Sequence, residues 1–292
     1  MCRFLCYLGP PVLLADVLFR PTHSLILQSY KSRERREPLN GDGFGVGWYA
    51  PDAGPIPGVF TSLTPAWSNQ NLRRLAEHVR SPCFFAHVRA ASPGMRVGDE
   101  NCHPFQNGRY LWMHNGSIEG FSRIKRRLRE SLPDPLYDAV QGTTDSEHAF
   151  ALFLSFLGDL QRPLGGEEMG QTLVRTVIQL EEWRVAADIA GPSFYNFAVT
   201  DGRYVSTLRY VSEPTVEPIS LYFAEGRKYE CVDGGSRLVP AADGERSAII
   251  ASEPFTATRA GWVRVPPNHT LTVGPDLRVQ LALLERSAGL PR

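Results

Sequence analysis

Short apolar and aromatic runs alternate with helix-like segments in the first half of the chain. Runs bounded by Gly, Pro or Asn are typical of strands, and they occur at residues 44–49, 83–89 and 110–114. Apolar residues recur at helical spacing at residues 12–19, 69–79 and 117–132. This half of the chain is therefore predicted to mix strands with helices.

The second half begins with helices and returns to strands. Helices are predicted at residues 144–157 and 168–187, and the first opens on Thr144, a good N-cap followed by acidic residues. Strands are predicted at residues 194–200, 204–210, 219–224, 247–251 and 269–273. This order predicts an α+β protein in which two sheets lie between helix layers. We expect one domain over residues 1–292, with a loose tail at 287–292.

Composition excludes several classes of protein. The chain has 292 residues, and its 31 basic and 31 acidic residues cancel, which gives no long-range attraction to nucleic acid or an anionic membrane. No apolar run reaches the roughly 18 residues of a membrane span, and no signal peptide is recognisable. The five cysteines lack CxxC spacing, so we expect no metal site, no disulfide framework and a reducing, cytoplasmic location.

Cys2 directly follows Met1 and is the first candidate for chemistry. Cysteine is small enough to permit removal of Met1, which would give Cys2 both a thiol and a free α-amine. An α-amine has a reference pKa of about 7.7 to 8.0, so it can take the thiol proton near neutral pH. One residue would then supply both nucleophile and base. Taken alone, a cysteine at this position is more often incidental.

Four further residues suit the cleavage of an amide. Asn115 and Gly116 follow a predicted strand, and a side-chain amide with a backbone N–H can stabilise an oxyanion. Arg89, at a strand end, can hold a carboxylate with two parallel hydrogen bonds. Asp145, near a helix start, can hold an ammonium group. In isolation, these residues also fit a plain turn, a surface charge and a helix cap.

Six motifs occur in a fixed order over residues 1–150. They are Met1-Cys2-Arg3, Asn40-Gly41-Asp42-Gly43-Phe44-Gly45, His87-Val88-Arg89, Asn101-Cys102-His103-Pro104-Phe105, His114-Asn115-Gly116 and Thr144-Asp145-Ser146-Glu147. This series resembles the class II glutamine amidotransferases, which are N-terminal-nucleophile hydrolases. The resemblance implies a four-layer αββα sandwich of two mostly antiparallel sheets.

The same resemblance implies roles for seven residues. Cys2 would be the nucleophile, and Asn115 and Gly116 the oxyanion hole. The resemblance places four residues in or beside the substrate pocket: Arg89 and Asp145 for the glutamyl carboxylate and amine, Ser92 in its wall, and His103 in the His-Pro segment. It implies no cofactor.

Further segments narrow the resemblance. Arg20-Pro21-Thr22-His23-Ser24, Thr64-Pro65-Ala66-Trp67-Ser68 and Ala251-Ser252-Glu253-Pro254 are similar to the amidotransferase-like subunit of the alternative glutathione-degradation complex. The last of these segments is also similar to the amidohydrolase of ergothioneine biosynthesis. The chain departs from many relatives in having Ala90 and Pro93 where they carry an aromatic residue and a histidine, so we expect a roomier pocket.

Three hypotheses about function stay open. The first is hydrolysis of a γ-glutamyl amide such as glutathione through a Cys2 thioester. The second is an ergothioneine-type γ-glutamyl hydrolase, or a glutaminase that feeds ammonia to a synthase partner. The third is a catalytically silent γ-glutamyl-binding or scaffold subunit. The resemblance implies a separate metallopeptidase-like partner chain for the first hypothesis, and the sequence itself shows no such partner.

Overall fold

A computed structural model of the chain describes residues 2–34, 39–91, 96–232, 235–242, 244–256 and 258–284. Four sequence predictions fall outside these ranges. They concern Met1, Ser92, Pro93 and the tail at 287–292.

The described strands form two antiparallel sheets. The first has the order β10-β9-β11-β1-β4-β2-β3, with β12 paired to β9. Its strands are β1 (Arg3–Leu13), β2 (Phe44–Trp48), β3 (Gly58–Ser62), β4 (Arg80–Val88), β9 (Tyr222–Val232), β10 (Gly235–Pro240), β11 (Ser247–Ala251) and β12 (Val263–Arg264). The second has the order β14-β13-β8-β7-β6-β5. Its strands are β5 (Phe105–Asn107), β6 (Tyr110–Ser117), β7 (Phe194–Thr200), β8 (Val205–Val211), β13 (His269–Val273) and β14 (Val279–Leu283).

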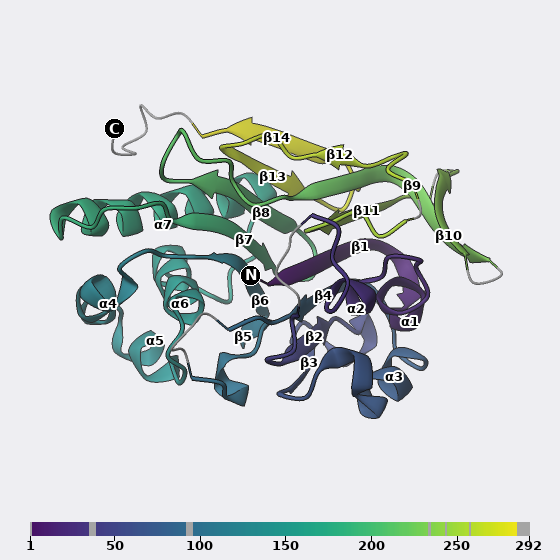
Figure 1. Ribbon diagram of the computed structural model, residues 1–292, viewed down its shortest axis with the longest axis horizontal. Helices are drawn as coiled ribbons and strands as arrows, with labels where there is room; N and C mark the ends of the chain where they lie inside the picture. Colours follow the sequence, from purple (N-terminus) through teal and green to yellow (C-terminus); the bar gives the residue numbers. More distant parts are fainter. Residues whose placement is uncertain are drawn as a thin grey trace.

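Helices cover the outer face of each sheet (Figure 1). The first sheet packs against α1 (Leu14–Leu18), α2 (Leu25–Gln28) and α3 (Gln70–Ala76). The second packs against a group formed by α4 (Phe121–Glu130), α5 (Asp134–Ala139), α6 (Asp145–Leu157) and α7 (Gly166–Ala186). Short 3₁₀ helices lie at Pro51–Ala53, Ala66–Ser68 and Asp99–Asn101. None of the helices in the described ranges is long and apolar enough to cross a bilayer.

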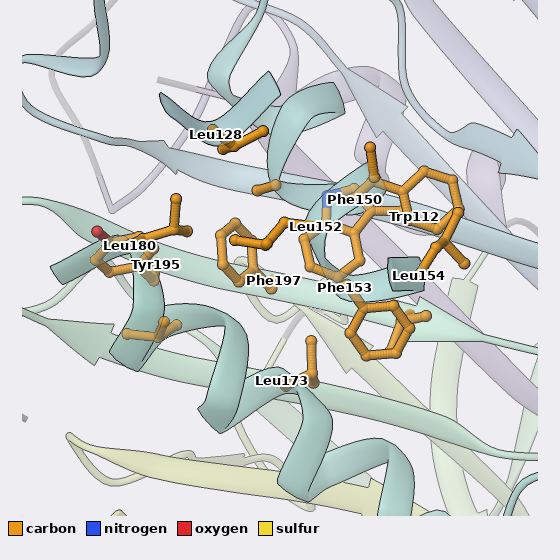
Figure 2. Packing of buried hydrophobic residues seen from close by; sticks show 14 of the residues in the cluster. Trp112, Leu128, Phe150, Leu152, Phe153, Leu154, Leu173, Leu180, Tyr195 and Phe197 are labelled. Carbon is orange, nitrogen blue, oxygen red and sulfur yellow. The ribbon is translucent and has the colours of Figure 1, made fainter. Parts of the chain in front are cut away.

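Three apolar cores separate the four layers. Figure 2 shows the core under α6 and α7, where Trp112 of β6 packs on Phe150 and Phe153 of α6 and on Phe197 of β7. A second core lies under α1 to α3, and a third lies between the sheets. The inter-sheet core contains Phe4 of β1, so this strand is covered on both faces. The predicted α+β four-layer sandwich is confirmed.

Several predicted boundaries were wrong, among them that of the strand predicted at 219–224, which is β9 and runs from Tyr222 to Val232. The segment predicted as a helix at 12–19 is preceded by β1, and its helix begins only at Leu14. The first six residues of β1 are all buried, and a strand covered on both faces shows no alternation of apolar and polar residues. The helix predicted at 117–132 begins at Phe121, because pairing with β7 extends β6 to Ser117.

Candidate active site

Strand register brings the start of β1 and the end of β4 together. Arg3 pairs with Val88 across these two strands, so Cys2 lies beside Arg89. On the other side of β4, the N–H of Arg89 donates to the carbonyl of Gly43 at 2.8 Å. Three motifs that are remote in the sequence therefore meet at one end of the first sheet.

The Cys2 thiol lies at this junction. Its Sγ is 3.6 Å from the carbonyl oxygen of Ala90, and the residue is half-buried. Burial raises the pKa of the Cys2 thiol, while the hydrogen bond to Ala90 and the charge of Arg89 act in the opposite direction. The resting sulfur is therefore a protonated thiol near neutral pH, and a nucleophilic role requires a base close by.

Arg89 is held by the loop before β2. Its Nη1 donates to the carbonyl of Asp42 and its Nη2 to the carbonyl of Arg96, both at 3.3 Å. The Asp42 carboxylate in turn accepts the N–H of Ala91 at 2.8 Å. A guanidinium has five N–H donors, and these two bonds leave donors for a carboxylate ligand. The loop needs Gly43, whose φ is +113° and whose Cβ would lie 2.7 Å from the Cys102 sulfur.

Asn115 and Gly116 lie near the end of β6 in the second sheet. Asn115 is fully buried, and its Nδ2 donates to Ser252 Oγ at 3.3 Å. Its Oδ1 has no hydrogen-bond partner among the described residues. At position 116, a Cβ would lie 2.0 Å from the Phe194 carbonyl oxygen, so only glycine fits there.

Ser252 links the two sheets at this point. Its hydroxyl accepts the backbone N–H of Phe4 at 3.0 Å as well as the Asn115 amide. Its own N–H donates to the Phe4 carbonyl at 3.0 Å, which continues the pairing of β11 with β1. One hydroxyl therefore joins the strand that begins after Cys2 to the amide predicted to stabilise the oxyanion.

Glu253 fixes the same strand through a buried ion pair. The carboxylate accepts Arg3 Nε at 2.7 Å and His23 Nε2 at 3.0 Å. Arg3 Nη1 also donates to the carbonyl of Cys2 at 2.9 Å. Burial raises the pKa of Glu253, but the hydrogen bond with His23 and the charge of Arg3 outweigh it and lower the pKa to about 2. The carboxylate is thus ionised at neutral pH and holds the Arg3 side chain that binds the Cys2 carbonyl.

Asp145 begins α6 on the outer side of the second sheet. Its Oδ2 accepts the N–H of Ile118 at 2.8 Å, and its Oδ1 accepts the Ser146 hydroxyl at 3.1 Å. His114 Nε2 donates to the Phe194 carbonyl at 3.0 Å, and burial lowers the pKa of His114 against the opposing charge of Asp145. These bonds fix the carboxylate beside the turn that follows Gly116.

His103 packs inside the protein. Its ring stacks on His87 with centroids 4.2 Å apart and meets the edge of Phe105 at 4.6 Å. Burial lowers the pKa of His87 to about 3 and also lowers that of His103, so both rings are neutral. The sulfur of Cys102 packs against Gly43, and burial raises the pKa of this thiol to about 11. The stacked His103 ring thus packs against His87, which lies two residues before Arg89 at the end of β4.

The structure thus places Arg89 beside Cys2, links Asn115 through Ser252 to the strand that follows Cys2, and fixes Asp145 at the turn after Gly116. Sequence reasoning missed the parts played by Ser252, Glu253 and His23, although all three lie in segments quoted for the narrower resemblance. No group of three or more His, Cys, Asp or Glu side chains in the described ranges could hold a metal ion. A groove of about 520 Å³ between α7 and β14 contains none of the predicted site residues.

Comparison with known proteins agrees with this fold. The sequence profile of the class-II glutamine amidotransferases matches residues 13–279. The Saccharomyces cerevisiae protein "Probable glutamine amidotransferase DUG3" is 41% identical over 94% of this chain and 82% of its own. The Mycobacterium tuberculosis gamma-glutamyl-hercynylcysteine sulfoxide hydrolase is 36% identical over 99% of both chains.

Solved structures show the same architecture. A glutamine aminotransferase class-II domain protein from Silicibacter pomeroyi superposes with a TM-score of 0.68 at 27% identity, over 97% of this chain and 98% of that one. The glutamine phosphoribosylpyrophosphate amidotransferase of Bacillus subtilis superposes with a TM-score of 0.59 at 15% identity. That match covers 97% of this chain and 49% of the other, and it supports the fold alone. The chain belongs to the class-II glutamine amidotransferases, a family of enzymes that includes named hydrolases.

Proposed function

We propose that this enzyme hydrolyses a γ-glutamyl amide, with Cys2 as nucleophile. The observation that carries the proposal is the shared Ser252 hydroxyl, which ties the strand following Cys2 to the Asn115 amide. An N-terminal nucleophile on one sheet and an oxyanion donor on the facing sheet leave the cleaved carbonyl between them.

Before any reaction, Met1 is removed, and this frees the α-amine of Cys2. Because the Cys2 pKa is raised, this amine takes the thiol proton as the sulfur attacks the γ-carbonyl. The Asn115 side chain and the Gly116 N–H stabilise the oxyanion. The Cys2 ammonium passes its proton to the amide nitrogen as the C–N bond breaks, so the amine leaves and a γ-glutamyl thioester remains on Cys2. Water then adds to the thioester while the Cys2 amine takes one of its protons. Release of glutamate passes that proton to the sulfur and restores the thiol.

Two charged residues recognise the glutamyl head in this proposal. Arg89 binds the α-carboxylate, because its guanidinium is buried and held in place while it keeps free donors. Asp145 binds the α-ammonium, because its carboxylate is fixed by two hydrogen bonds and its oxygens retain further lone pairs.

The leaving group is proposed to be an amine larger than ammonia. The Cys2 thiol contacts the backbone carbonyl of Ala90, and this residue has only a methyl side chain where many relatives carry an aromatic ring. A relative that matches over 99% of both chains is, by its name, a hydrolase of a large γ-glutamyl compound. We therefore favour hydrolysis over ammonia transfer to a synthase. Association with a separate metallopeptidase-like chain stays a prediction, which co-purification with the products of neighbouring genes would test.

The test is a substrate panel on protein whose N-terminus has been verified by intact mass. We expect glutathione or another γ-glutamyl amide to be cleaved faster than glutamine. Cys2→Ala should abolish turnover, and Asn115→Ala should lower kcat by about 100-fold or more while the fold survives. Turnover retained by Cys2→Ala would refute the proposal. Retained Met1, together with no turnover of any γ-glutamyl substrate, would instead favour a silent binding subunit.

A further inference from the structure

Two buried amide oxygens lie next to each other on the second sheet without partners. Asn115 of β6 pairs directly with Asn196 of β7, so both side chains are on the same face. The Oδ1 atoms of both have no hydrogen-bond partner among the described residues. An unsatisfied buried acceptor typically costs about 1 to 3 kcal/mol, so the arrangement as it stands is unfavourable.

The hydrogen bonds that the Ser252 hydroxyl makes among the described residues, to Phe4 and Asn115, do not use its proton. Its oxygen accepts from Phe4 N and, in this orientation of the amide, from Asn115 Nδ2. A hydroxyl offers one donor besides its acceptor lone pairs. The bond that would use this donor can form only if the amide presents its oxygen to Ser252.

We propose that the Asn115 amide is turned by half a rotation in the native protein, with or without substrate, and that Ser252 holds it there. The two ends of an asparagine amide have nearly the same shape, so this turn needs no change in packing. The Ser252 hydroxyl then donates to Asn115 Oδ1, after a small shortening of the present 3.3 Å separation. Ser252 is thereby a positioning residue for the oxyanion donor, an inference that rests on the proposed function.

The turned Asn115 amide also gives Asn196 Oδ1 a hydrogen-bond donor. Asn196 Nδ2 donates to the carbonyls of Ile219 and Ser220, both at 3.2 Å, and this fixes its amide with Oδ1 as an acceptor. Side chains directly opposite each other in an antiparallel pair have Cβ atoms about 4.5 to 5.5 Å apart, within hydrogen-bond reach for two asparagines. One Asn115 N–H can serve Asn196, and the other is left for the substrate oxyanion.

This arrangement makes a kinetic prediction for position 252. Without the hydroxyl, the amide is free to present its oxygen to the developing oxyanion, which would repel it. We expect Ser252→Ala to lower kcat by about 10- to 100-fold with KM nearly unchanged, less than the loss of the donor itself. Ser252→Thr keeps the hydroxyl and should recover most of the activity.

Ser220→Ala is the matched control. The Ser220 hydroxyl donates to the Ser252 carbonyl at 3.0 Å, so its removal disturbs the same segment without contacting Asn115. We expect this variant to keep kcat within about twofold of wild type. Equal losses in Ser220→Ala and Ser252→Ala, or full activity of Ser252→Ala beside an active wild type, would overturn the inference and leave the proposed function standing.

Labelling of Cys2 with two electrophiles distinguishes loss of oxyanion-donor positioning from a general loss of thiol reactivity. A glutamine-like diazoketone alkylates the thiol at its diazo carbon, which takes up the thiol proton and loses N₂, while its ketone oxygen occupies the oxyanion hole. Iodoacetamide alkylates the sulfur with loss of iodide and does not use the oxyanion hole. Ser252→Ala should slow labelling of Cys2 by the diazoketone about 10-fold or more while leaving the iodoacetamide rate unchanged. Equal slowing with both reagents would overturn the inference.

Neutron diffraction of the resting protein tests the geometry without any turnover. We expect a deuterium on Ser252 Oγ that points to Asn115 Oδ1, and two deuteriums on the opposite end of the amide. A deuterium on the amide nitrogen facing Ser252 would refute the proposal. Because this measurement does not depend on substrate, failure of the proposed γ-glutamyl chemistry is distinguishable from failure of the positioning role.

Discussion

Replacement of Glu253 by glutamine tests whether the buried ion pair organises the start of β1. Glu253 is fully buried, and its carboxylate accepts Arg3 Nε, His23 Nε2 and the N–H of Arg33. Glutamine preserves the shape of the side chain but replaces one acceptor oxygen with an NH₂ group. That group would face either Arg3 or the donors of His23 and Arg33.

The pKa of Glu253 sets the size of the effect. The ordinary pKa of a glutamate is about 4.3, so a folded-state pKa of about 2 corresponds to about 3 kcal/mol of stability at neutral pH. Arg3 is itself buried and would lose the charge of Glu253, which lies 2.7 Å from its Nε. Breaking one side of a buried pair typically costs about 3 to 5 kcal/mol, so we expect Glu253→Gln to lower the free energy of unfolding by that amount.

The effect has a defined pH dependence. Because the pKa of Glu253 is lower in the folded state, its contribution is complete above the unfolded-state pKa of about 4.3 and is lost as the pH falls toward 2. Integrating the linkage relation between pH 7 and pH 3.5 gives a loss of about 1 kcal/mol for the wild type. The glutamine variant has no such group to titrate, so the difference in stability between the two proteins should narrow by this amount.

Urea-induced unfolding, followed by tryptophan fluorescence at both pH values, measures the two quantities. Glu130→Gln is the control, because Glu130 forms an exposed pair with Arg126 and surface pairs contribute about 0 to 1 kcal/mol. If Glu253→Gln and Glu130→Gln lowered the free energy of unfolding equally, the buried pair would not stabilise the site as argued.

Three further predictions concern the substrate side. Gly116→Ala should lower kcat by about 100-fold or more, because the added Cβ would lie 2.0 Å from the Phe194 carbonyl and displace the oxyanion donor. Steady-state kinetics on the folded variant measures this effect, and normal turnover would contradict it. Ala90→Phe should depress cleavage of glutathione much more than cleavage of glutamine, as a two-substrate comparison would show; parallel losses would argue against a leaving-group pocket there. Asp145→Asn should raise KM by about 10-fold or more with a smaller change in kcat. The amide keeps an acceptor oxygen for the N–H of Ile118 but loses the negative charge that holds the substrate ammonium. An unchanged KM would show that Asp145 does not bind the substrate.

Sequence patterns predicted the sheets and helices of this fold better than they predicted the contacts around Cys2 and Asn115. The strands at 194–200 and 247–251 were predicted with the observed boundaries, because turn residues mark where each run stops. β1 was missed because burial on both faces erased its alternation. The motifs identified Cys2 and the Asn115-Gly116 pair, but a hydrogen bond between residues 137 positions apart leaves no periodic signal in the chain.

The two residues that follow β11 show why that end of the molecule depends on tertiary structure. Ser252 contacts the oxyanion amide, and its neighbour Glu253 holds Arg3, which in turn binds the carbonyl of Cys2. Ser252 and Glu253, which are adjacent after β11, thus position both the predicted oxyanion donor and the predicted nucleophile. Since β11 lies about 250 residues from Cys2 in the chain and pairs directly with β1, the nucleophile reaches its position only when the C-terminal strands have closed the first sheet. A variant that weakens pairing of β11 with β1 should therefore lose activity before it loses the core under α6 and α7.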